Sequence, residues 1–261
     1  MSIDSAIAQE ADIRVIDGWT LHEFAEVTST NSLAAHLPPW TAVRATVQTA
    51  GRGRTGHRWI SDENGLWVSA VLPTPGDSAR WSLLPLAAGW AALSVVRALG
   101  LPEARLRWPN DILVGRRKLA GVLVDRFSVN AAVVGFGLNV ANRPDRVDST
   151  LGGEVVRLAD LLPEPPSFTI LLVRLLAALT REHHRLESGD ACGLCRDLGS
   201  AWLHRRVEVI LAGGVDAIDG HLEGVDPNGS LLLRDAAGDV HVFPAHRVEL
   251  LREIFPTNLT T

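Results

Sequence analysis

The chain has 261 residues, of which 46% are hydrophobic and 21% charged, and its formal net charge is −5. This composition is that of a globular protein of one or two domains, and the acidic balance argues against a broad nucleic-acid surface. No basic segment precedes an apolar one at the start, and no uncharged run reaches the roughly 20 residues that cross a bilayer, so we expect a cytoplasmic protein with no membrane partner.

Strands and helices are predicted to alternate through the first half of the chain. Residues 1–12 read as a loose leader. Ser29-Thr30-Asn31 supplies side-chain oxygens that suit the start of a helix over 32–37. Apolar patterning predicts strands over 19–27, 42–50, 66–72, 105–108, 112–114, 119–124 and 131–140, with a long helix over 79–99.

The second half begins with a predicted loop over 141–158 and two helices over 168–188 and 190–204. After Arg205 the pattern changes to short strands separated by strong turn sequences, Asp226-Pro227-Asn228-Gly229 and Asp235-Ala236-Ala237-Gly238. The short strands are predicted over 207–211, 218–225, 230–234 and 240–243. A run of such strands indicates a small barrel, so we expect two domains, residues 1–204 and 205–261.

Lys118 is the only lysine, and the other 24 basic residues are arginines. An ammonium is a compact charge that suits a single carboxylate or phosphate oxygen, whereas a guanidinium is a wide planar fork. Lys118 also begins an apolar run, which places it on a hairpin strand. The sequence therefore predicts a specific role for an ammonium at this position.

A basic, glycine-rich loop over residues 51–58 carries three glycines and three arginines. Backbone N–H groups and guanidinium groups in such a loop suit phosphate or pyrophosphate. Its spacing matches neither a dinucleotide fingerprint nor a Walker loop. Taken alone, the loop is equally consistent with a mobile surface loop or an RNA-binding Arg-Gly segment.

Two further motifs are ambiguous in isolation. Trp108-Pro109-Asn110-Asp111 forms a turn that needs no function, although its carboxylate could hold magnesium or steer an attacking amine. Gly135-Phe136-Gly137-Leu138-Asn139 ends a strand with two glycines and an amide, which fits close approach of a ligand to the backbone.

The order of these motifs resembles that of the biotin protein ligases. The motifs that carry the resemblance are Thr28-Ser29-Thr30-Asn31, Gln48 with Ala50-Gly51-Arg52-Gly53-Arg54, Arg107-Trp108-Pro109-Asn110-Asp111, Arg117-Lys118-Leu119-Ala120-Gly121 and 135–139. The resemblance implies an α/β catalytic domain with a central mixed sheet and flanking helices, of the class II aminoacyl-tRNA synthetase and biotin ligase type. A small C-terminal SH3-like β-barrel is expected to follow it.

Family members use ATP to convert biotin to biotinyl-5′-AMP, and they then transfer the biotinyl group to one lysine of an acceptor domain. The resemblance therefore implies ATP and biotin as substrates and Mg²⁺ as cofactor. It also implies a partner, the biotin carboxyl carrier domain of acyl-CoA or pyruvate-type carboxylases. Only about 18 residues precede Trp19, so we expect a monofunctional enzyme that binds no DNA.

The resemblance also implies roles for single residues. Catalysis is expected from Lys118, Arg54 and Asp111, and Asp111 is also the expected metal contact. Biotin is expected to contact Ser29, Thr30, Asn31, Gln48, Gly51, Arg52, Lys118 and Gly121. The adenylate is expected to contact Arg52, Gly53, Arg54, Trp67, Asn110, Leu123 and Asn139. His57 stands where the family loop often carries an arginine, and Arg58 is a candidate substitute.

Two alternatives stay open. A lipoate or octanoate ligase of the same superfamily would share the sheet and the lysine, but a long aliphatic acid needs a more apolar tunnel. A noncatalytic Arg-Gly RNA-binding module would need stacking aromatics and a basic face, whereas the chain has no tyrosine and is acidic.

Overall fold

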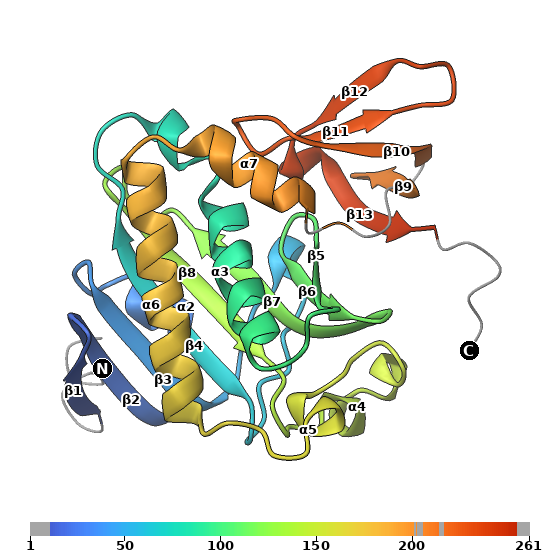
Figure 1. Cartoon of the computed structure of the whole chain (residues 1–261). Coiled ribbons are helices and arrows are strands. Elements are labelled where there is room, and N and C mark those ends of the chain that lie inside the picture. The colour runs from blue at the N-terminus through green and yellow to red at the C-terminus, as the bar shows by residue number, and fades with distance from the viewer. Residues whose placement is uncertain (1–10, 201, 203–205, 214–216, 255–261) are drawn as a thin grey trace.

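An eight-stranded mixed sheet forms the centre of the computed structural model in Figure 1, which describes residues 11–200, 202, 206–213 and 217–254. Its strand order is β1-β2-β3-β4-β8-β7-β6-β5, in which β2 and β3 are parallel and all other neighbours antiparallel. The strands are β1 (Asp12–Ile16), β2 (Trp19–Val27), β3 (Thr41–Gln48), β4 (Leu66–Pro73), β5 (Arg105–Arg107), β6 (Asp111–Val114), β7 (Arg117–Asp125) and β8 (Ala131–Leu138). The predicted mixed sheet is confirmed.

The first strand, β1, lies between the predicted leader over 1–12 and the predicted strand over 19–27, where the sequence predicts no element. It pairs antiparallel with β2 through a turn at Asp17 and Gly18, whose φ angles are 47° and 83°. An Asp-Gly pair is a strong hairpin sequence, since both central positions of such a turn need positive φ. The turn sequence was therefore present, and the prediction overlooked it.

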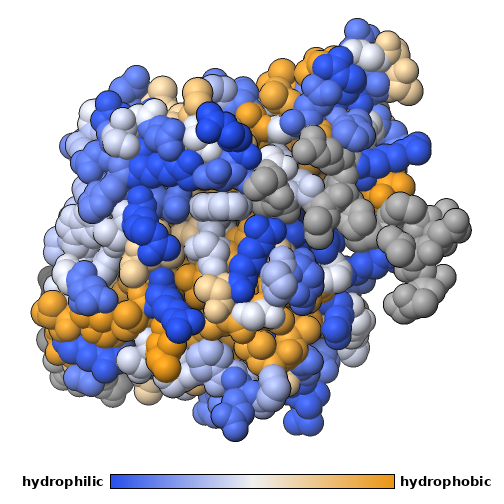
Figure 2. Space-filling view, viewed as in Figure 1, coloured by the Kyte–Doolittle hydropathy of each residue, from blue (hydrophilic) through white to orange (hydrophobic). Residues whose placement is uncertain are grey.

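Helices cover both faces of the sheet. Helices α3 (Leu84–Ala98) and α6 (Phe168–Glu187) pack on one face over the large hydrophobic core, and α2 (Thr30–Ala34) packs on the other over a smaller core (Figure 1). Hydrophilic side chains cover much of the α3/α6 face, with hydrophobic patches between them (Figure 2). The shorter helices are η1 (Arg54–Gly56), η2 (Ser78–Trp81), α4 (Pro144–Val147), η3 (Ser149–Leu151), α5 (Leu158–Leu161), α7 (Ala191–Ser200) and η4 (Ala245–Arg247).

The helix predicted over 79–99 is divided into η2 and α3. Pro85 lies in the first turn of α3, where its missing N–H costs nothing, so the regular helix begins there. The stretch Ser78–Ala98 is long and apolar enough to cross a membrane by composition, but 67% of its apolar 18-residue segment is buried inside the protein. It therefore reads as a core helix.

A five-stranded antiparallel sheet follows, with the order β12-β11-β10-β9-β13. Its strands are β9 (Arg206–Leu211), β10 (Ala217–Val225), β11 (Leu231–Arg234), β12 (Val240–Phe243) and β13 (Val248–Glu253), of which the last was not predicted. Within the described ranges no pairing of β12 with β13 closes it, so it agrees with an SH3-like unit without forming a closed barrel. The predicted boundary at 204 and 205, and the last residues of the predicted 190–204 helix, lie outside the described residues.

The C-terminal sheet is fixed to the eight-stranded sheet by buried polar contacts. Arg105 on β5 is 2% exposed and forms a two-pronged ion pair with Glu253 on β13. Trp108 Nε1 donates to the carbonyl of Gly229, 3.2 Å away. These contacts place β13 beside β5, and the turn over 226–229 beside Trp108.

Candidate active site

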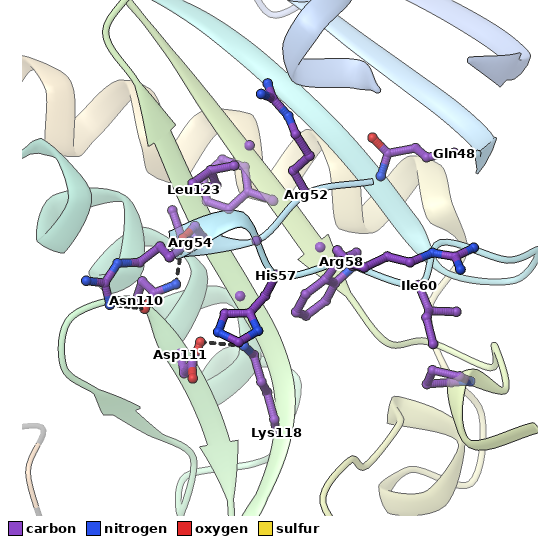
Figure 3. Close-up of a pocket in the computed structure, with 18 of the residues that line it drawn as sticks. Gln48, Arg52, Arg54, His57, Arg58, Ile60, Asn110, Asp111, Lys118 and Leu123 are labelled. Carbon is purple, nitrogen blue, oxygen red and sulfur yellow. Dashed lines mark hydrogen bonds and ion pairs between the residues drawn. The ribbon is translucent and has the colours of Figure 1, made fainter. Parts of the chain in front are cut away.

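A cavity of about 380 Å³ opens on the α2 side of the sheet, between β7, β8, the glycine-rich loop and the C-terminal sheet. Figure 3 shows the glycine-rich loop crossing in front of the strands, with its side chains leaving in different directions. The cavity is lined by Ser29, Thr30, Asn31, Gln48, Arg52, Gly53, Arg54, His57, Arg58, Trp59, Ile60, Asn110, Asp111, Lys118, Gly121, Val122, Leu123, Gly135, Phe136, Gly137, Asn139, Pro144, Leu151, Val155, Glu249 and Leu250.

Strand β8 forms the floor because its side chains alternate between two faces. Phe136 and Leu138 point into the large core, so Gly135 and Gly137 face the cavity. A Cβ at Gly135 would lie 2.1 Å from Asn31 Oδ1, and a Cβ at Gly137 would lie 2.5 Å from the Trp59 ring. Only glycine at these two positions lets Asn31 and Trp59 lie this close to the sheet.

Four polar side chains, Thr30, Asn31, Gln48 and Ser69, form an amide–hydroxyl cluster at one end of the cavity, and all but Gln48 are buried. Gln48 Oε1 accepts from the Thr30 backbone N–H at 2.8 Å and from the Thr30 hydroxyl at 3.0 Å. Ser69 Oγ lies 2.7 Å from Thr30 Oγ1 and 2.6 Å from Asn31 Oδ1. The cluster contains no charged group.

The opposite end carries charges, and we call Arg107, Asp111 and Lys118 the charged end. Lys118 Nζ lies 2.7 Å from Asp111 Oδ1, and Arg107 Nη2 lies 2.7 Å from Asp111 Oδ2. Lys118 Nζ also lies 4.8 Å from the centroid of the Trp59 ring, a cation–π contact. The single lysine is thus held by a carboxylate and an aromatic face beside the cavity.

Asp111 is buried and negatively charged. Burial by itself would raise its pKa, but the Coulombic attraction and hydrogen bonds of Lys118 and Arg107 outweigh burial and hold the pKa below its usual value. Both carboxylate oxygens are engaged by these cations, so a metal ion at Asp111 would have to replace one of them. The residues around Asp111 do not fit a resident metal site.

The glycine-rich loop is a tight hairpin, not an open loop. Gly53 N–H donates to His57 O at 2.7 Å, and Trp59 N–H donates to Gly51 O at 2.9 Å. Figure 3 shows His57 extending toward Lys118, whereas Arg58 extends away from it. Both His57 and Arg58, the substitute considered from the sequence, line the cavity.

Arg54 joins this loop to the C-terminal sheet. Its Nη2 donates to the carbonyl of Ala245 at 2.9 Å, and its Nη1 lies 3.5 Å from Asn110 Oδ1 (Figure 3). Burial lowers the pKa of Arg54, and the nearby charge of Asp111 acts against this shift. The guanidinium is therefore placed between two elements that are far apart in the sequence.

The structure brings nearly all of the sequence-predicted site residues to one cavity. Those that line it are Ser29, Thr30, Asn31, Gln48, Arg52, Gly53, Arg54, Asn110, Asp111, Lys118, Gly121, Leu123 and Asn139. Gly51 and Trp67 are not among the lining residues. Trp67 is fully buried and meets Trp59 edge to face, so it supports the wall behind the cavity.

Three parts of the lining were not predicted. Trp59 directly follows the glycine-rich loop, and Gly121 and Gly137 opposite it leave room for its large ring. Leu151 and Val155 come from the predicted loop over 141–158, where Lys118 N–H donates to Glu154 O at 2.8 Å and Val156 N–H to Lys118 O at 3.0 Å. Glu249 and Leu250 come from β13, and no local pattern marks any of these contacts.

Comparison with known proteins gives a consistent result. The biotin/lipoate A/B protein ligase family matches residues 23–139. A biotin–acetyl-CoA-carboxylase ligase of Paracoccus denitrificans is 33% identical, and the alignment covers 86% of this chain and 98% of that protein. A ligase of the same name from Mycobacterium tuberculosis is 34% identical, with 78% of this chain and 77% of that protein covered.

Solved structures agree on the fold. The biotin protein ligase of Aquifex aeolicus in complex with biotin and ATP superposes with a TM-score of 0.77 at 24% identity, covering 90% of this chain and 99% of that one. The biotin protein ligase of Leishmania major in complex with biotinyl-5-AMP superposes with a TM-score of 0.60 at 23% identity, covering 86% of this chain and 98% of that one.

Proposed function

The chain belongs to the biotin protein ligases of the biotin/lipoate A/B protein ligase family, and we propose that its acceptor is one lysine of the biotin carboxyl carrier domain of a biotin-dependent carboxylase. The enzyme activates biotin with ATP and transfers the biotinyl group to protein. Carboxylases of the acyl-CoA or pyruvate type in the cytoplasm are the proposed setting.

The amide–hydroxyl cluster is the observation that carries the choice of biotin. The Thr30 backbone N–H fixes Gln48 Oε1 as an acceptor, so the Thr30 hydroxyl must donate to it. The single proton of the Ser69 hydroxyl faces two acceptors, Thr30 Oγ1 at 2.7 Å and Asn31 Oδ1 at 2.6 Å, so one of these two contacts lacks a proton. The cluster is therefore one donor short.

A ligand with N–H donors would complete this cluster. The ureido ring of biotin brings two N–H groups and a carbonyl, whereas the dithiolane of lipoate and the alkyl chain of octanoate bring no donor. Leaving buried acceptors unpaired costs about 1–3 kcal/mol per group, which is a strong basis for selection. The cluster supports biotin over its two closest chemical rivals.

The charged end would serve the activation step. A biotin carboxylate oxygen attacks the α-phosphorus of ATP, the bond to the β-phosphate breaks, and pyrophosphate leaves. We assign Lys118 to neutralise the carboxylate and α-phosphate oxygens, with Asp111 and the Trp59 ring orienting its ammonium. Arg52 and Arg54 are assigned to close the loop over the adenylate.

The transfer step uses the same space. The neutral acceptor amine attacks the acyl carbon of the mixed anhydride, the bond to AMP breaks, and the proton of the amine leaves to the AMP phosphate or to water. Because two cations hold the Asp111 carboxylate in its charged form, Asp111 is better suited to orienting Lys118 than to accepting a proton. We propose that magnesium enters with the ATP phosphates, since the surroundings of Asp111 do not fit a metal site of their own. We also propose a domain boundary near residue 204.

The proposal is tested by incubating the chain with biotin, ATP and magnesium and measuring biotinyl-5′-AMP by mass spectrometry. A carrier domain is then added, and its acceptor lysine should gain the biotinyl group. Parallel reactions with lipoate and octanoate should give no adenylate above background. Adenylate from lipoate at a rate equal to that from biotin would overturn the substrate assignment.

A further inference from the structure

Asp125 ends strand β7 just outside the cavity, and it touches both the amide–hydroxyl cluster and the glycine-rich loop. Its Oδ2 accepts from Asn31 Nδ2 at 2.9 Å and lies 3.6 Å from Arg52 Nη2. Arg52 Nη2 also donates to Ser32 Oγ at 3.3 Å. One carboxylate therefore meets a cluster residue and a loop residue.

A charged carboxylate can only accept hydrogen bonds, so it decides which way the Asn31 amide points. The NH₂ group must face Asp125, and Oδ1 must then face Ser69 and the cavity. Asn31 is 6% exposed and lies against Gly135, so its side chain stays in place and the carboxylate decides which end of the amide faces it. Asp125 thereby turns Asn31 into an acceptor within the cluster.

This orientation creates the shortage of donors in the cluster. If the Asn31 amide were reversed, its NH₂ group would donate to Ser69 Oγ, and the Ser69 and Thr30 hydroxyls could donate onward to Thr30 and Gln48. Every contact would then have a proton without any ligand. The surplus of acceptors, and hence the demand for a ligand with N–H groups, depends on the carboxylate at 125.

We propose that Asp125 is a positioning residue that fixes the Asn31 amide so that the cluster selects an N–H-bearing ring, and that it tethers Arg52 to the same point. The inference rests on the proposed function, because the selected ring is the ureido ring of biotin. The ion pair with Arg52 is weak, since its side chains are 54% and 41% exposed. The orientation of Asn31 is the main effect.

The test is the Asp125→Asn variant of the full chain, with biotin affinity measured by calorimetry. An asparagine at 125 can offer either group to Asn31, so the amide loses its imposed direction. The dissociation constant for biotin should rise about tenfold, the cost expected for one lost hydrogen bond to a buried group. The maximal rate of adenylate formation at saturating biotin should change less than about twofold.

Two control variants separate this role from a loss of charge or of fold. Asp125→Glu keeps the acceptor-only group and should restore most of the biotin affinity. Asp12→Asn removes one exposed carboxylate on β1 and should leave both biotin affinity and rate at wild-type values. Equal biotin affinity in Asp125→Asn and wild type, or failure of Asp125→Glu to recover, overturns the inference.

A double-mutant cycle tests whether the effect of Asp125→Asn on biotin binding passes through Arg52. In an Arg52→Gln background, Asp125→Asn should still weaken biotin binding several-fold, because Asn31 is released in both backgrounds. Disappearance of the effect would overturn the role assigned to Asn31. Wild-type biotin binding is measured first: its absence refutes the proposed function, whereas normal wild-type binding with an unaffected variant refutes only the role of Asp125.

Discussion

The two ends of the cavity differ in charge and in burial. In the amide–hydroxyl cluster, Ser69 is 0%, Thr30 4% and Asn31 6% exposed, and every group is neutral. At the charged end, the side chains of Lys118 and Arg107 are 27% and 26% exposed around a more buried Asp111. Neutral buried groups discriminate between ligands by leaving the wrong one unpaired, whereas charges stabilise a reacting phosphate.

This difference predicts that recognition and activation can be damaged separately. Substitutions in the cluster should raise the dissociation constant for biotin, and those at the charged end should lower the rate of adenylate formation. The following changes are ordered from the largest expected effect to the smallest.

Lys118→Arg tests the charged end most directly. The guanidinium fork cannot reproduce the point contact of the ammonium, so adenylate formation should fall by at least about 100-fold while the fold is kept. The measurement is pyrophosphate release at saturating biotin and ATP, with thermal unfolding as the control for structure. A near-normal rate would remove Lys118 from the reaction.

Gly135→Ala and Gly137→Ala form a matched pair at the two ends. The added methyl at 135 meets Asn31 Oδ1, so biotin affinity should fall about tenfold or more. The added methyl at 137 meets Trp59, which contacts Lys118, so that variant should lose adenylation rate more than biotin affinity. Identical kinetic profiles for the two variants would contradict the separation of the ends.

Arg54→Ala should weaken retention of the adenylate more than binding of biotin. Arg54 connects the loop to Ala245, and a charged hydrogen bond of this kind is worth roughly 1.5–3 kcal/mol, or about tenfold or more in affinity. The dissociation rate of biotinyl-5′-AMP and the calorimetric affinity for biotin are measured for Arg54→Ala and for wild type. Equal losses of free energy for both ligands would show that the loop does not close over the intermediate.

The smallest change near neutral pH is expected in the unfolding free energy that depends on the ionisation of Asp111. Its pKa is lowered in the folded state, so the stability gained from its ion pairs is present above the ordinary carboxyl pKa and is lost only as pH falls through the folded value. The difference in unfolding free energy between wild type and Asp111→Asn should therefore stay constant from about pH 7 to pH 5 and shrink only below about pH 4. Denaturant unfolding of both proteins across this pH range measures the difference. A difference in unfolding free energy that already declines near pH 6 would contradict the prediction.

Much of the fold follows from local patterns, and the contacts that complete the site do not. The mixed sheet is confirmed, because alternating apolar residues and turn sequences specify most of its strands, and the similar proteins confirm the biotin ligase resemblance. The support of Lys118 by Val155 and the contribution of Leu250 depend on where distant segments pack, which no local spacing encodes. Asp125 has ordinary neighbours in the sequence, and its importance arises only from the orientation of Asn31.

The division of helix 79–99 and the missed strand β1 have different causes. Pro85 was visible in the sequence, but the pattern did not show that the helix would start again there instead of continuing. The Asp17-Gly18 turn was equally visible, yet the strand before it is short and mostly exposed, so its pattern was weak. Pairing with β2 decides both whether β1 forms and in which register it lies.

The buried pair between Arg105 and Glu253 matters to anyone who shortens or tags this enzyme. A version cut before residue 253 would strip a guanidinium in the interior of its carboxylate partner, and breaking such a pair typically costs about 3–5 kcal/mol. The same cut would also loosen the strand that carries Leu250 to the cavity rim. Fusion partners are therefore better joined after Glu253, and truncation libraries should treat that glutamate as their last permissible end point.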